Sequence, residues 1–93
     1  MKFLDYIPIG RENAVLMREL SERLNITPRT LRLIIQRERE QGAPICSDWE
    51  NGGYFMPADE GEARTYYLQQ QHRIKTASAA LNGVRDYLKR GER

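Results

Sequence analysis

A three-residue break, "NIT" at positions 25–27, constrains this chain more than any other feature, because it separates two amphipathic segments. Asn25 tolerates the left-handed backbone conformation that ends helices. Thr27 is a good helix N-cap, and Pro28 behind it sits at the first helical position, where its missing N–H costs nothing. The pattern therefore predicts that one helix ends at this break and that another begins at about Pro28.

The segments on both sides of the break have helical periodicity. In the first, leucines recur every four residues and so share one face; they are Leu16, Leu20 and Leu24. The second is expected to end at Gly42 after running to about Gln41, with an inner face formed by Leu31, Ile34 and Ile35. Two helices joined by so short a turn form a helix-turn-helix.

Other patterns flank this pair of helices. Residues 1–9 predict an irregular or short extended arm, because Pro8 discourages a helix just before it. A short helix is expected after Gly10. Following the second helix, the β-compatible runs "APICS" and "GYFMP" enclose the turn residues "DWENG", which predicts a β-hairpin.

The remainder, from about Asp59 to Arg90, reads as one long helix. Eight of its residues are spaced alternately four and three apart, which is a heptad seam typical of coiled coils. They are Ala63, Tyr67, Gln70, Ile74, Ala77, Leu81, Val84 and Leu88. A second copy of the same helix is the simplest partner for this seam. Parallel and antiparallel pairing, and a bundle of more than two helices, all stay open.

This order of elements resembles winged helix-turn-helix DNA-binding domains, especially the biotin-repressor type and its small versions in bacterial and phage regulators. The residues that carry the resemblance are Glu19, Leu20, Leu24, Ile26, Thr27, Arg29, Thr30, Leu31, Arg32, Gly42, Gly52, Gly53 and Tyr54. They cover about half of the chain. The resemblance implies a mainly α fold, in which a three-helix core and a small β-hairpin wing precede a long coiled-coil-like helix.

In this interpretation the chain has three parts: an N-terminal arm (1–9), a winged helix-turn-helix domain (10–57) and a long dimerisation helix (58–93). The wing residues are Trp49, Asn51, Gly52, Gly53 and Tyr54. The hairpin loop carries Asp48 and Glu50 and no basic residue, so we expect its tip to repel phosphate. Glu38 also departs from the pattern, since it stands where such helices usually bury an apolar residue.

The outer stripe of the second helix has the chemistry of DNA recognition. Arginine pairs with the O6/N7 edge of guanine, glutamine pairs with the N6/N7 edge of adenine, and leucine can touch a thymine methyl. Threonines at the helix start suit phosphate. The candidate DNA-binding residues are Thr27, Arg29, Thr30, Arg32, Leu33, Gln36 and Arg37.

Composition narrows the class of protein. The net charge is only +2, so affinity for nucleic acid must come from local clustering of charge. A single cysteine and a single histidine offer no disulfide and no zinc site, and no apolar run reaches membrane length. We expect a cytoplasmic homodimer that binds double-stranded DNA, with no metal, no cofactor and no enzymatic activity. The alternative is a protein-interaction adaptor that keeps the winged fold without binding DNA.

Overall fold

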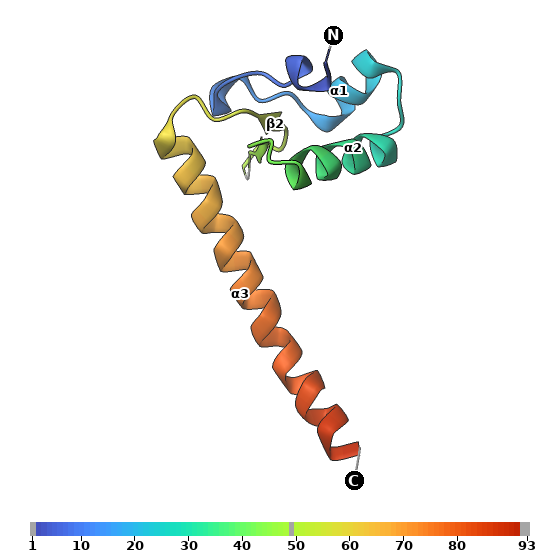
Figure 1. Ribbon diagram of the computed structural model, residues 1–93, viewed down its shortest axis with the longest axis vertical. Helices are drawn as coiled ribbons and strands as arrows, with labels where there is room; N and C mark the ends of the chain where they lie inside the picture. The colour runs from blue at the N-terminus through green and yellow to red at the C-terminus, as the bar shows by residue number, and fades with distance from the viewer. Residues whose placement is uncertain (1, 49, 92–93) are drawn as a thin grey trace.

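The computed structural model describes residues 2–48 and 50–91, which form a small N-terminal domain and one long helix (Figure 1). The α-helices are α1 (Met17–Leu24), α2 (Pro28–Glu40) and α3 (Glu60–Gly91). Two short 3-10 helices precede them, η1 (Phe3–Tyr6) and η2 (Arg11–Asn13). The strands β1 (Cys46–Ser47) and β2 (Tyr54–Phe55) form an antiparallel hairpin between α2 and α3.

The predicted break between α1 and α2 is confirmed. Asn25 follows α1 in the left-handed conformation, with φ 54° and ψ 47°. Thr27 caps α2, because its side-chain Oγ1 accepts a hydrogen bond of 3.1 Å from the N–H of Thr30. Local capping chemistry thus fixes where one helix stops and the next begins.

The hairpin continues into the N-terminal half of the domain. Ser47 lies opposite Tyr54 in the ladder, and Val15 pairs with the other edge of Tyr54. The Tyr54 N–H donates to the Val15 carbonyl at 2.8 Å, and the Val15 N–H donates back at 3.0 Å. Nearby, the Met56 N–H donates to the Pro8 carbonyl at 2.7 Å. Strand β2 therefore lies between β1 and the segment that precedes α1.

The core lies where α1, α2 and the hairpin meet. Leu20 from α1 and Leu31 from α2 are fully buried. The cluster of buried apolar residues contains Ile7, Val15, Leu20, Leu31, Ile35, Ile45 and Tyr54. Because α1, α2 and each strand bury only one or two side chains, the position of each element depends on its neighbours.

Three expectations about the domain need correction. The N-terminal arm was expected to be irregular or extended, but it contains η1, and its Ile7 lies in the core. The helix expected after Gly10 is the short 3-10 turn η2, so the described part of the domain has two α-helices and not three. Ile34 is only half-buried, because the inner face of α2 is centred on Leu31 and Ile35.

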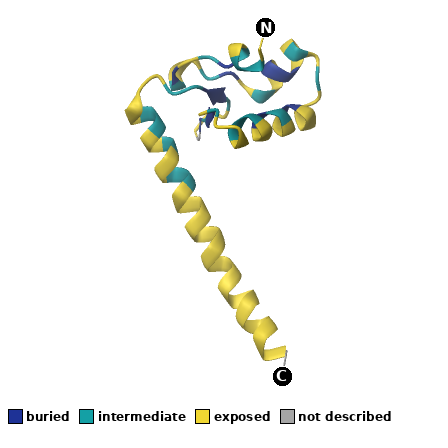
Figure 2. Cartoon of the chain, viewed as in Figure 1, coloured by how far each residue is buried: buried dark blue, intermediate teal, exposed yellow. Residues whose placement is uncertain are grey.

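Helix α3 leaves the domain after its first turns and extends alone (Figures 1 and 2). The Cα radius of gyration is 17.0 Å, against about 12 Å for a compact chain of this length. From residue 71 to 91 every position is exposed. Within the described ranges, we find no helix that combines the length and the apolar character needed to cross a membrane.

Candidate nucleic-acid interface

The structure places all seven candidate DNA-binding residues on the outward surface of α2 and of its N-cap. Burial of Leu31 and Ile35 fixes which side of α2 faces the core, so the opposite side faces solvent (Figure 2). Leu33 lies in the middle of this outer side with 50% of its surface exposed. Arg29, Arg32 and Gln36 flank it, and Arg37 lies one helical turn after it.

Most of the other arginines of the domain are held by partners inside the protein. Arg23 pairs with Glu19 at 2.9 Å, and Arg18 lies 3.9 Å from Glu22. These are the i,i+4 contacts typical of a helix surface. Arg11 pairs with Asp48, which lies in the hairpin loop.

The three arginines on the outer side of α2 differ from these in their pairing with acidic residues. Arg29, Arg32 and Arg37 form no ion pair with any carboxylate of residues 2–48 or 50–91. Gln36 bonds Glu40 at 3.2 Å, in an exposed contact that a ligand can replace at little cost. The outer side of α2 therefore presents positive charge that the described part of the chain does not neutralise.

The two threonines at the start of α2 bond each other. Thr27 Oγ1 lies 3.0 Å from Thr30 Oγ1, in addition to accepting the Thr30 N–H. Both side chains are exposed. They cap the helix, and the same hydroxyls stand at its positive end, where an anion is favoured.

The hairpin loop is organised around Asp48, which is 8% exposed. Its Oδ1 accepts the Glu50 N–H at 3.1 Å, and its carbonyl accepts the Gly52 N–H at 3.0 Å. Gly53 has φ 99°, and a Cβ at this residue would lie 2.9 Å from the Val15 carbonyl oxygen. Glycine is therefore required where the loop passes the Val15 backbone.

The predicted wing residues fall into three groups. Asn51 and Gly52 are exposed on the loop, and Gly53 is half-buried. Tyr54 is buried in the core, so it supports the hairpin and does not offer its ring to a ligand. Trp49 lies outside the described residues.

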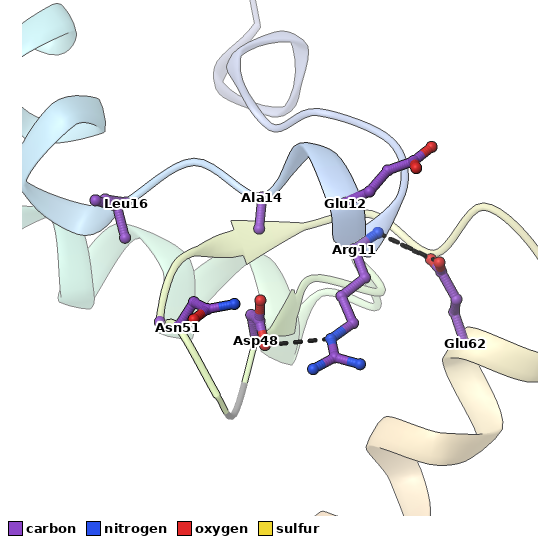
Figure 3. A pocket seen from close by; sticks show the side chains of 8 residues that line it. Arg11, Glu12, Ala14, Leu16, Asp48, Asn51 and Glu62 are labelled. Atoms are coloured by element: carbon purple, nitrogen blue, oxygen red, sulfur yellow. Dashed lines mark hydrogen bonds and ion pairs between the residues drawn. The ribbon is translucent and has the colours of Figure 1, made fainter.

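Whether the loop acids repel phosphate stays a prediction, but both acids have a basic partner within the domain. From η2, the Arg11 Nε lies 3.2 Å from Asp48 Oδ1 (Figure 3). The Arg11 Nη2 lies 3.3 Å from Glu50 Oε1. Burial alone would raise the pKa of the Asp48 carboxyl, but the Glu50 N–H and the Arg11 guanidinium outweigh it and lower this pKa below its ordinary value. An arginine 37 residues earlier thus offsets about half of the negative charge of the two loop acids.

Arg39 is an organising residue that the sequence reasoning missed. Its Nε donates to the Ile45 carbonyl at 3.0 Å, and its Nη2 donates to Ser47 Oγ at 3.0 Å. Its guanidinium carbon lies 6.0 Å from the ring centre of Tyr54 and 5.9 Å from that of Tyr66. Arg39 therefore joins α2, the hairpin and α3. Its spacing of four from the buried Ile35 was the available signal that it faces inward.

The residues of the predicted heptad seam differ in their exposure to solvent. Ala63 and Gln70 are half-buried beside the domain, whereas the other six are exposed: Tyr67, Ile74, Ala77, Leu81, Val84 and Leu88. Helix α3 is fixed to the domain at its start, where Glu62 accepts the Arg11 backbone N–H at 3.2 Å and the Ala58 N–H at 3.0 Å.

The chain matches no family model, no curated protein and no solved structure. Residues 2–48 and 50–91 contain no group of three or more histidine, cysteine or acidic side chains placed to hold a metal ion. The outer side of α2 is therefore the candidate interface, because it combines arginines without acidic partners among the described residues, an exposed apolar and an amide side chain, and threonines at the helix start.

Proposed function

We propose that this protein binds double-stranded DNA sequence-specifically, with α2 as the recognition helix in the major groove. Its role would be that of a homodimeric transcriptional regulator or of a phage-type DNA-transaction factor. The order of elements supports a winged helix-turn-helix, since a short turn joins α1 to α2 and a hairpin follows directly. The Val15 pairing with β2 supports the same assignment.

The observation that carries the proposal is the uneven pairing of the arginines. Arg11, Arg18 and Arg23 are neutralised by acids of the chain. Arg29, Arg32 and Arg37 have no such partner among the described residues, and all three lie on the outer side of one helix. Guanidinium groups outside ion pairs can bind phosphate or the edge of guanine without first breaking a contact to a carboxylate.

The shape of α2 suits this use. A helix with its side chains is about 10–12 Å in diameter, and the major groove of B-DNA is about 12 Å wide. Leu33 and Gln36 add an apolar and an amide contact between the arginines, so the surface can distinguish bases as well as attract phosphate. Arg11 offsets one of the two negative charges of Asp48 and Glu50, which reduces an electrostatic obstacle beside the helix.

A homodimer is the second part of the proposal. The exposed seam of α3 offers a contact face for a second copy, and two copies would present two recognition helices to an operator with inverted symmetry. Linking two weak half-sites raises the overall affinity, which suits a domain with a net charge of only +2.

The test is selection of bound sequences from random DNA duplexes at low salt. We expect enrichment of an inverted repeat and a steep loss of affinity as salt rises. Arg32→Ala should cost about 1–3 kcal/mol at one base position. Arg23→Ala is the matched control, because it removes an arginine that already pairs with Glu19. If no sequence is enriched at micromolar protein, the proposal fails and the adaptor function is favoured instead.

A further inference from the structure

The part of α3 beyond the domain carries an apolar face with nothing packed against it. Ile74, Leu81 and Leu88 are 65%, 64% and 60% exposed. A helix without tertiary packing is only marginally stable in water, and a continuous apolar face on a surface marks an interaction site. The charge of this segment is one-sided, since six basic residues and only Asp86 among the acids lie from position 64 to position 90.

The domain occupies the beginning of this same face. Ala63, Tyr66 and Gln70 are half-buried, and the ring of Tyr66 lies against Arg39. A partner helix that followed the seam from its start would therefore meet the hairpin. In a parallel pair both domains would crowd this end, on the side where the helices have to touch. An antiparallel pair places each domain at an opposite end.

We propose that two copies of α3 pair antiparallel, with their crossing point at residues 77–80. Large and small side chains alternate along the seam, and antiparallel pairing matches them. Ile74 packs on Val84 of the second copy, and Leu81 packs on Ala77 of the second copy. In a parallel pair Ala77 would face Ala77, between layers of larger side chains at Ile74 and Leu81. The two small side chains would leave a void in the contact, and voids destabilise packing.

The flanking residues favour the same register. Ser78 and Ala80 each face their own counterpart at the centre, and their small side chains let the backbones approach closely. Arg73 faces Tyr87 of the second copy, an arrangement suited to a cation–π contact. A longer overlap that brings Leu88 to Ala63 would place Arg64 opposite Arg85 and drive each helix end into the other domain.

This arrangement deepens the proposed homodimer and rests on it, though not on DNA binding. In this register the Tyr66 residues of the two copies lie about 40 Å apart along the helix axis. The two recognition helices of a DNA-bound dimer are separated by one turn of the duplex, about 34 Å, or by a multiple of it. Antiparallel pairing therefore separates the domains by a distance of the right order for successive major grooves.

Disulfide formation between engineered cysteines tests the orientation without DNA. We expect Ala80→Cys to form a disulfide-linked dimer under mild oxidation, because position 80 faces position 80 in the antiparallel pair. Val84→Cys should not, because the two residues 84 would lie about 15 Å apart. In a parallel pair the result reverses, since residues 84 would face each other and residues 80 would lie on opposite flanks. The unaltered protein is the control, because its only cysteine, Cys46, is buried and burial raises the pKa of its thiol.

Sedimentation equilibrium of the unaltered protein completes the test, with a dimer expected at tens of micromolar. Cross-linking of Val84→Cys instead of Ala80→Cys overturns the antiparallel arrangement. A dimer in which neither variant cross-links overturns the register, and a monomer overturns pairing altogether. Arg29→Ala should leave the cross-linking unchanged, so failure to bind DNA and failure to pair are separate results.

Discussion

The Nε atom of Arg11 lies 3.2 Å from Oδ1 of Asp48, and this ion pair connects η2 to the hairpin loop across 37 residues. The same oxygen also accepts the Glu50 N–H at 3.1 Å, so the Asp48 side chain joins the ion pair to the backbone of the loop. Neutralising Asp48 would remove the charge attraction to Arg11 and weaken both hydrogen bonds to this oxygen.

The pair makes stability depend on acid pH. Because the folded pKa of Asp48 is lowered below the unfolded value of about 3.9, the ionised group stabilises the fold fully above that value. Its contribution is lost as pH falls through the folded pKa. Urea unfolding between pH 7 and pH 2 should show a steeper loss of unfolding free energy for the unaltered protein than for Asp48→Asn. Parallel curves for the two proteins would contradict this role of Asp48.

The two acids of the loop should respond differently to reversal of charge. Glu50 is largely exposed, so Glu50→Lys should keep the fold and strengthen binding to non-specific DNA with a larger salt slope. Asp48→Lys would bury a second cation beside Arg11 and should destabilise the hairpin. Measurements of unfolding and of affinity at two salt concentrations separate the effects. An unfolded Glu50→Lys protein would refute the distinction.

Arg37 and Arg39 lie two residues apart on α2, and we expect substitutions at the two positions to have different effects. Arg39→Ala removes two hydrogen bonds and the contacts with the rings of Tyr54 and Tyr66, so it should cost about 1–3 kcal/mol of stability. Arg37→Ala should change stability by less than about 0.5 kcal/mol and instead reduce the salt-dependent affinity for DNA. Thermal unfolding and binding titrations check both. Equal losses of stability would argue against this division of roles.

Replacing Gly53 and Gly83 with alanine should have opposite effects on stability. Gly53→Ala places a Cβ against the Val15 carbonyl at a positive φ, so it should destabilise the domain by at least about 1 kcal/mol. Gly83 lies within α3, where an added Cβ would meet no atom within 4 Å, so Gly83→Ala should stabilise this helix by about 0.5–1 kcal/mol. Circular dichroism on heating measures both changes, and a neutral Gly53→Ala would show that the loop can move away from Val15.

The seam of α3 can be tested by burying charge. Replacing both Ile74 and Leu81 with aspartate would place like charges in the proposed contact and should dissociate the proposed dimer. The domain should stay folded, because neither residue is buried in the monomer, while operator affinity should fall. Ala79→Asp, on the side of α3 away from the seam, is the control and should remain dimeric. Sedimentation equilibrium that finds both variants dimeric would place the interface elsewhere.

Features set by neighbouring residues could be predicted from the sequence. The helix break follows from Asn25, Thr27 and Pro28, whose preferences act within one turn of the chain. The hairpin follows from the glycines at 52 and 53 between two β-compatible runs. The outer side of α2 follows from the periodicity that buries Leu31 and Ile35.

Features that depend on distant residues were not predictable in this way. No local pattern connects Arg11 to Asp48, so the loop acids were expected to be unbalanced. Arg39 was missed because a basic residue near a helix end is usually solvated. Its partners, in the hairpin and in α3, follow it by six or more residues and form no helical pattern with it. The N-terminal residues were expected to form an arm because their pairing partner, Met56, lies far along the chain.

The position of β2, between β1 and the segment that precedes α1, determines when the domain can fold during synthesis. The backbone groups of Tyr54 and Met56 form hydrogen bonds with Pro8, Gly10 and Val15. The domain therefore cannot complete its fold before Tyr54 and Met56 have been synthesised. Until then its apolar side chains stay accessible to proteases and chaperones. A chain terminated within the hairpin would lack both a closed core and α3. Such a product could not take part in the proposed dimer, because it lacks the helix that carries the seam.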